Sequence, residues 1–123
     1  MPGLETHYAV RDIEERILAA LRAAGLNPGQ RLSPAALGAL DHFHTGGLRA
    51  SRELLELARI RADDRVLDIG AGLAGPARLL ASALGCRVDC LDMSQDYCAG
   101  AVLLNRLTGL DDRIDVHEGS ALD

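Results

Sequence analysis

The chain has 123 residues, of which 48% are hydrophobic and 25% are charged, and its formal net charge is −5 at pH 7. This length suits one modest domain, and the acidic balance argues against a nucleic-acid partner, because phosphate binding needs a clustered basic face. No apolar run approaches the length of a membrane span, and residues 1–16 lack the apolar core of a signal peptide, so we expect a cytoplasmic protein with no membrane partner.

Residues 1–62 have the pattern of a helical segment. Apolar residues recur at helical spacing in its first part, and Gly25 follows them where a C-terminal cap is wanted. Ser33 followed by Pro34 marks a helix start, because serine is a good N-cap and proline suits the first helical position. The predicted helices cover residues 8–24, 34–40 and 48–59.

Residues 63–123 alternate between strand and helix patterns. Ser94 is a helix N-cap, and Gly85 and Gly109 each follow a helix as its C-terminal cap. The predicted elements are, in order, a strand at Arg65–Ile69, a helix at 76–84, a strand at 87–91, a helix at 95–107 and a strand at 113–117. This βαβαβ order predicts an α/β fold whose parallel sheet has right-handed crossovers.

A three-stranded parallel sheet is half of a doubly wound fold, and one strand edge would be left unpaired. We therefore expect the sequence to be the N-terminal fragment of a longer enzyme, truncated after the third strand. Self-association through the open sheet edge is the alternative.

The segment VLDIGAGLAGPAR contains a literal G-x-G-x-x-G, made of Gly70, Gly72 and Gly75. Glycines after a parallel strand allow a tight turn and a close approach of the backbone to a ligand at the start of the next helix. The pattern alone does not separate NAD, FAD and S-adenosylmethionine as ligands.

Asp68, two residues before the first glycine, helps to distinguish between these ligands. A dinucleotide would bring two phosphate charges to this turn, and the carboxylate would repel them. S-adenosylmethionine brings an α-ammonium and a sulfonium instead, both cationic, so an acid suits it. The competing interpretation is that Asp68 only caps local amides.

Asp92, at the end of the second predicted strand, is placed to accept hydrogen bonds from the two hydroxyls of a ribose. Ser94 already fills the role of helix cap, which weakens the interpretation of Asp92 as an ordinary capping acid. Met93 can lie on an adenine face or fill the core. In the loop after the third strand, Ser120 and the amide of Ala121 are candidates to hold the base.

These motifs resemble the first motifs of class I S-adenosylmethionine-dependent methyltransferases. The resemblance covers residues 65–123, and the stretches HTGG, GPAR and SQDYC further resemble a bacterial subgroup near the small-molecule N- and C-methyltransferases. It implies a Rossmann-like fold, S-adenosyl-L-methionine as cofactor and a small-molecule methyl acceptor. Residues 63–123 would be the first half of the cofactor-binding domain, and residues 1–62 would cover the cofactor site.

The resemblance also implies roles for single residues. Asp68 and the glycine turn would contact the methionine portion, Asp92 the ribose, Met93 the adenine face, and the loop at 120–121 the base. The implied cofactor-binding residues are Asp68, Gly70, Ala71, Gly72, Gly75, Asp92, Met93, Ser120 and Ala121, together with His44 and Thr45 from the segment that would line the pocket.

Two residues depart from the family pattern. Ala74 stands where glycine is frequent, and we expect its methyl group to cost little. Ser120 replaces a frequent aspartate, which makes the contact with the adenine amine weaker or mediated by water. The strands that carry much of the substrate pocket in this family are absent, so no catalytic residue is assigned and activity of the 123 residues alone is not implied.

Other clusters give no site. Cys86, Cys90 and Cys98 are an odd number without C-x-x-C spacing, so we expect reduced, mostly buried thiols. The two histidines in residues 41–47 lack a suitable further ligand, so we expect no metal. Two alternatives to a methyltransferase stay open: an NAD(P)-dependent oxidoreductase cofactor domain, and a non-catalytic half-domain that associates through its sheet edge.

Overall fold

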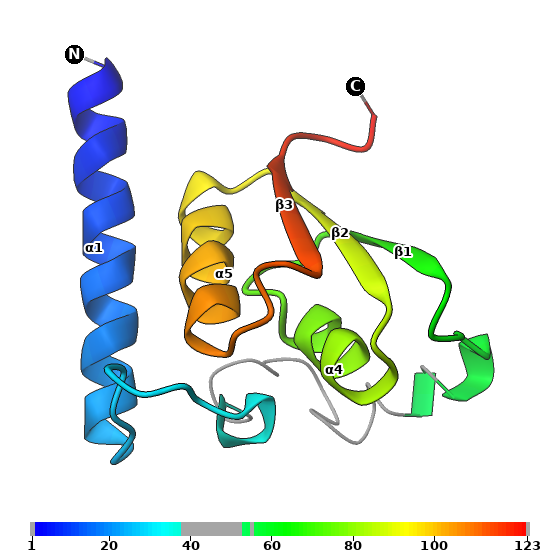
Figure 1. Cartoon of the computed structure of the whole chain (residues 1–123). Helices are drawn as coiled ribbons and strands as arrows, with labels where there is room; N and C mark the ends of the chain where they lie inside the picture. The colour runs from blue at the N-terminus through cyan, green and yellow to red at the C-terminus, as the bar shows by residue number, and fades with distance from the viewer. Residues whose placement is uncertain (1, 38–52, 55, 123) are drawn as a thin grey trace.

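The computed structural model describes residues 2–37, 53–54 and 56–122 of the chain. A long helix and a short 3-10 helix precede a βαβαβ unit (Figure 1). The elements are α1 (Pro2–Ala23), η1 (Pro34–Leu37), β1 (Arg65–Ile69), α4 (Gly75–Leu84), β2 (Arg87–Asp92), α5 (Gln95–Leu107) and β3 (Ile114–Glu118).

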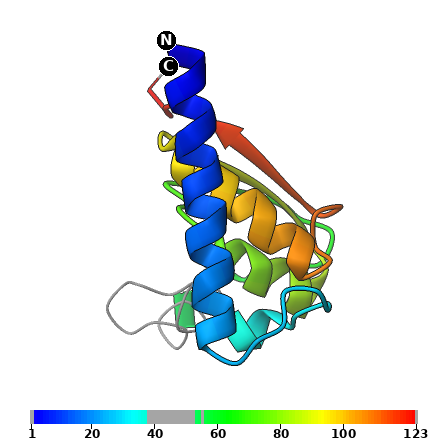
Figure 2. The same cartoon turned by 90° about the vertical axis from the view of Figure 1, so that its left-hand side faces the viewer.

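The three strands form one parallel sheet in the order β1-β2-β3. In the register of this sheet, Ile69 lies beside Leu91 and Leu91 beside His117, so all three strands present their carboxyl ends at one edge. Helices α4 and α5 both pack on the same side of the sheet (Figure 2). This is the predicted α/β arrangement with a Rossmann-like first half, and it is confirmed.

The main core lies between the sheet and these two helices. It is aliphatic, because the strands contribute small and branched side chains, and α4 together with its N-cap residue contributes three alanines and a leucine. Its buried members are Ala74, Ala77, Leu80, Ala81, Cys86, Val88, Cys90, Ala101, Leu110 and Ile114.

A second core lies between α1 and α5, where Ile17 and Leu21 of α1 are almost fully buried. Gly100 permits this close approach, since a Cβ atom there would lie 2.9 Å from Cδ1 of Ile17 and 2.7 Å from Cδ2 of Leu73. Burying two such side chains contributes about 1.5–3 kcal/mol each. Among the described residues, no helix is both long and apolar enough to cross a membrane.

The predicted boundaries in the βαβαβ unit agree with the structure to within one residue. Helix α1 begins at Pro2, six residues before the predicted start, because proline is tolerated in a first turn even where the apolar periodicity has ended. The short second helix is a 3-10 turn at 34–37, and its predicted end near Leu40 lies outside the described residues. Of the predicted helix at 48–59, residues 53–54 and 56–58 are helical and 48–52 lie outside the described residues.

The face of the sheet away from α4 and α5 carries an ion-pair network across all three strands. The Arg65 guanidinium donates from Nε and Nη2 to the Asp89 carboxylate at 2.6 and 3.2 Å, and Nη2 lies 3.9 Å from Asp115. Nε2 of His117 lies 3.2 Å from the same Asp89 carboxylate. The hydrogen bond from Arg65 lowers the pKa of Asp89 to about 2, and the contact with His117 acts in the same direction.

The Asp89 network should make stability depend on pH in a narrow acidic window. The pKa of Asp89 is about 2 in the folded chain and that of an unfolded aspartate is about 3.9, so the stabilisation is present above pH ~4 and is lost as the pH falls through ~2. We expect Asp89→Asn to reduce the free energy of unfolding near neutral pH, by a modest amount because the Arg65 side chain is 65% exposed.

Urea unfolding of the wild type and of Asp89→Asn across pH 2 to 7 measures this difference. The gap between the two free energies should close towards the acidic end. A gap that stays constant with pH would show that the ion-pair network does not act as described.

Candidate functional site

A hollow of about 290 Å³ lies at the carboxyl edge of the sheet. It is bounded by the ends of β1 and β2 and by the loop that follows β3. Its lining residues are Ile69, Gly70, Leu91, Asp92, Met93, Gly119, Ser120, Ala121 and Leu122. Ligands of open α/β sheets bind in this position, outside the carboxyl ends of the strands.

The glycine turn folds back onto the end of β2. The N–H groups of Gly70 and Ala71 both donate to the carbonyl of Leu91, at 2.8 and 3.2 Å. Gly70 and Gly72 have φ values of +71° and +56°, which residues other than glycine rarely adopt. The turn therefore requires glycine at these two positions for its backbone conformation.

Ala74 shares this left-handed conformation, with φ at +66°, and is completely buried at the N-cap position of α4. An L-residue in this region costs roughly 1–2 kcal/mol. The expectation that the methyl group costs little is therefore wrong for the backbone. Burial of the methyl group in the main core offsets part of that cost.

Asp92 joins the glycine turn to the start of α5. One carboxylate oxygen accepts the N–H of Gly72 at 2.9 Å, and the other accepts the N–H of Ser94 at 2.8 Å. Ser94 itself caps α5 by accepting the N–H of Tyr97. Ser94 is therefore the cap of α5, as expected, while Asp92 holds the N–H of Ser94 itself just before the helix begins.

Asp68 lies on β1 and is half-buried. Burial raises the pKa of Asp68 above its ordinary value, and the nearby charge of Asp92 raises it further. The negative charge of Asp92 thus disfavours the ionised form of Asp68. A cation placed between them would relieve this repulsion.

The structure brings five of the predicted cofactor residues together around the hollow. They are Gly70, Asp92, Met93, Ser120 and Ala121. Asp68, Ala71, Gly72 and Gly75 do not line it; Gly72 acts through its bond to Asp92, and Gly75 is buried at the start of α4. His44 and Thr45 lie outside the described residues.

Met93 is 74% exposed beside the hollow, so the alternative in which it fills the core is wrong. Ile69 and Leu91 also line the hollow, although neither is among the predicted site residues. Strand alternation could have found them, since both point away from α4 and α5. The Ser120 hydroxyl accepts the N–H of Leu122 at 3.1 Å, which shapes the loop behind the hollow.

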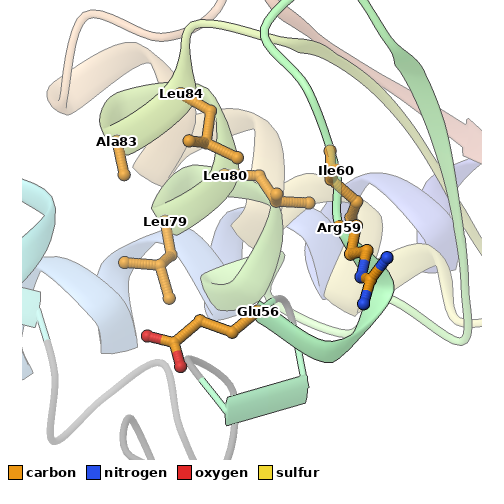
Figure 3. Close-up of a pocket in the computed structure, with 7 residues that line it drawn as sticks. All are labelled: Glu56, Arg59, Ile60, Leu79, Leu80, Ala83 and Leu84. Carbon is orange, nitrogen blue, oxygen red and sulfur yellow. The ribbon is translucent and has the colours of Figure 1, made fainter.

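A larger hollow of about 380 Å³ lies elsewhere, between α4 and the residues that precede β1 (Figure 3). Its floor is apolar, formed by Leu79, Leu80 and Ala83 among others, and Glu56 and Arg59 lie at its margin. None of the predicted cofactor residues that the structure describes lines it, and it is not at the carboxyl edge of the sheet.

The three cysteines are free and buried, as expected. Burial raises the pKa of the Cys90 thiol to about 12, and burial also raises that of Cys98. These groups are therefore protonated near neutral pH, and protonated thiols are poor nucleophiles.

Comparison with known proteins finds methyltransferases among the proteins similar to this chain, although no family model matches it. Over 80 residues the chain is 35% identical to a glycine/sarcosine/dimethylglycine N-methyltransferase from Actinopolyspora halophila, which covers 65% of this chain and 14% of that protein. Over 59 residues it is 42% identical to a sarcosine/dimethylglycine N-methyltransferase from Aphanothece halophytica, covering 48% and 21% of the two chains.

The chain also matches the solved structure of an S-adenosylmethionine-dependent methyltransferase from Geobacter sulfurreducens, which is in complex with S-adenosyl-L-homocysteine. The TM-score is 0.54 and the sequence identity is 29%. The match covers 58% of this chain and 29% of the Geobacter chain. The relatives of this chain are S-adenosylmethionine-dependent methyltransferases. Its sheet and helices form the same Rossmann-like fold as these methyltransferases. The chain spans 14% and 21% of the length of the two curated methyltransferases that it matches.

The double hydrogen bond of Asp92 predicts a structural role that is separable from ligand binding. Asp92→Ala should lower the free energy of unfolding by about 1–2 kcal/mol, since it leaves two amides without their acceptor. Asp92→Asn keeps one carbonyl oxygen and should recover part of the loss. Urea unfolding without ligand checks this, and equal stability of the wild type and both variants would contradict it.

Proposed function

We propose that this chain supplies the S-adenosyl-L-methionine-binding part of a methyltransferase that acts on a small-molecule acceptor. One observation carries the proposal. Asp68 and Asp92 stand at the ends of neighbouring parallel strands beside a glycine turn, and the pKa of Asp68 is raised partly by the charge of Asp92. That arrangement favours a ligand with a cationic portion over one with a pyrophosphate.

Asp92 has the capacity to bind a ribose without releasing its backbone partners. A carboxylate offers about four lone-pair sites, and the bonds from Gly72 and Ser94 use one on each oxygen. The remaining sites can accept from two neighbouring hydroxyls. The same side chain would thus hold the glycine turn and the sugar.

The walls of the hollow suit an adenine ring. Ile69, Leu91 and Met93 offer apolar surface, and the loop of Gly119, Ser120 and Ala121 offers polar backbone groups at its other side. Flat apolar walls with few polar groups are typical of nucleoside sites.

The cofactor supplies a methyl group on a sulfonium, which an aligned nucleophile can accept. Such a transfer depends chiefly on proximity and alignment, so the residues described need only to hold the cofactor in place. The similarity to N-methyltransferases named for glycine, sarcosine and dimethylglycine supports a small-molecule acceptor. We also propose a cytoplasmic location, supported by the three free thiols, because such thiols persist in reducing compartments.

Calorimetric titration of this chain with S-adenosyl-L-homocysteine tests the proposal, with NADH run against the same sample. We expect saturable binding of the nucleoside and none of NADH. Asp68→Asn should weaken nucleoside binding about tenfold or more, because a hydrogen bond to a charged group contributes about 1.5–3 kcal/mol and 1.4 kcal/mol is tenfold in affinity.

The wild-type affinity should also fall as the pH drops through the raised pKa of Asp68, and the Asn variant should lose this dependence. Asp111→Asn, which removes an exposed acid before β3 at the opposite end of the sheet, is the matched control and should bind as the wild type does. Tighter binding of NADH than of the nucleoside would assign the glycine turn to an oxidoreductase instead.

Within residues 2–37, 53–54 and 56–122, no strand pairs with the outer edge of β1, and this edge supports a second candidate function, association of copies of this chain. An unpaired edge strand offers a row of backbone donors and acceptors to another strand. We expect weak, concentration-dependent dimers in sedimentation experiments. A monomer at all concentrations would rule out self-association through this edge.

A further inference from the structure

Ala74 has a backbone conformation that alanine disfavours. Its φ is +66°, it is completely buried, and it is the N-cap residue of α4. A residue other than glycine stays in the left-handed region only where the surrounding structure holds it there. The contacts of α4 must therefore fix the position of Ala74 against its own preference.

Backbone hydrogen bonds connect Ala74 to the glycine turn on one side and to Arg78 on the other. The N–H of Ala74 donates to the carbonyl of Ala71 at 2.9 Å, and the carbonyl of Ala74 accepts the N–H of Arg78 at 3.0 Å. Arg78 thus lies one helical turn after the strained residue. A shift of this first turn of α4 would move Ala74 and, through Ala71, the neighbouring Gly70 that lines the hollow.

The side chain of Arg78 joins this first turn of α4 to α5. Nη1 of Arg78 donates to Oδ1 of Asn105 at 2.8 Å, and the two residues are 0% and 1% exposed. At the other end of α5, Asp92 accepts the N–H groups of Gly72 and Ser94. The two connections close a ring that contains the glycine turn, α4 and α5.

Stability alone does not account for an arginine in this position. A guanidinium loses its hydration when it is buried, and an apolar pair of similar volume often stabilises a protein as much or more. A hydrogen bond has a preferred direction, which apolar contacts lack. The bond from Arg78 to Asn105 therefore constrains the orientation of α4 in a way that its alanine and leucine contacts do not.

We propose that Arg78 and Asn105 form a positioning pair, which holds the first turn of α4 so that Ala74 stays left-handed and the glycine turn keeps its ligand-binding shape. Without the pair, Ala74 relaxes towards the right-handed region and its hydrogen bond to Ala71 is lost. The effect on S-adenosyl-L-methionine binding rests on the proposed function, whereas the hold on the turn does not.

The first test replaces both members of the pair, by Arg78→Met together with Asn105→Leu. Because no polar group of the pair is then left without a partner, the double variant should unfold in urea close to the wild-type midpoint. Calorimetry should nevertheless show that it binds S-adenosyl-L-homocysteine about tenfold or more weakly. The amides of Gly72 and Ala74, both hydrogen-bonded in the wild type, should exchange about tenfold or more rapidly, as measured by NMR.

Relief of the strain at Ala74 should restore what the loss of the pair removes. Ala74→Gly in the double variant should recover most of the lost affinity, because glycine adopts a positive φ at no steric cost. Its gain should be larger there than in the wild type. Ala77→Gly is the matched control and should recover none, since Ala77 is equally buried in α4 but does not have a positive φ.

A comparison at Asn105 alone covers the case in which the double variant does not fold. Asn105→Asp keeps an oxygen that accepts from Arg78, and it replaces Nδ2, a buried group with no hydrogen-bond partner among the residues that the structure describes. Asn105→Leu removes the acceptor. The Asp variant should bind the nucleoside about fivefold or more tightly than the Leu variant.

Wild-type affinity or wild-type exchange rates in the folded double variant would overturn the positioning pair. Equal effects of Ala74→Gly and Ala77→Gly, or equal affinities of the Asp and Leu variants at Asn105, would overturn it as well. If the wild type does not bind the nucleoside but the double variant exchanges faster at the turn, the pair is upheld and the proposed function is overturned.

Discussion

Asp92 accepts a backbone N–H through each of its two carboxylate oxygens, one from Gly72 and one from Ser94. Through these bonds a single side chain joins the turn after β1 to the helix after β2. The turn is also bonded to Leu91, the residue before Asp92, so β2 holds it through both backbone and side chain. The groups that line the hollow depend on these two hydrogen bonds, because the hollow lies where the turn after β1 and the end of β2 meet.

Beneath the turn, a fully buried arginine connects the two helices that cover the sheet. Nη1 of Arg78 on α4 donates to Oδ1 of Asn105 on α5 at 2.8 Å, and both residues are almost completely buried. A buried cation carries a desolvation cost that an aliphatic side chain would avoid, so an aliphatic contact would join the two helices with a smaller free-energy cost. The Arg78–Asn105 hydrogen bond restricts how α4 can rotate relative to α5, because a hydrogen bond is directional. Contacts between alanine and leucine side chains tolerate several rotations.

The βαβαβ unit could be predicted from the sequence because its signals are local. Ser94 marks the start of α5 and the glycines after each helix mark the ends of α4 and α5, and the strands between them are short segments in which apolar and polar residues mix. The position of the site followed from the same signals. The double bonding of Asp92 could not be predicted, because it depends on the distance between Gly72 and Ser94, which are 22 positions apart and meet only in the parallel register. The strain at Ala74 was missed for a related reason, since its φ is set by the turn rather than by its own preference.

The same sheet explains both the acidity of the site and the exposure of its apolar face. Alternation sends Asp68 to the helix side and Leu67 and Ile69 to the other, so one strand half-buries a carboxylate while it exposes two large aliphatic side chains. The buried carboxylate has a raised pKa because water is excluded from it on the covered side. The raised pKa of Asp68 and the exposure of Leu67 and Ile69 are therefore two consequences of one alternation along β1, which places the acid towards the helices and the aliphatic side chains away from them.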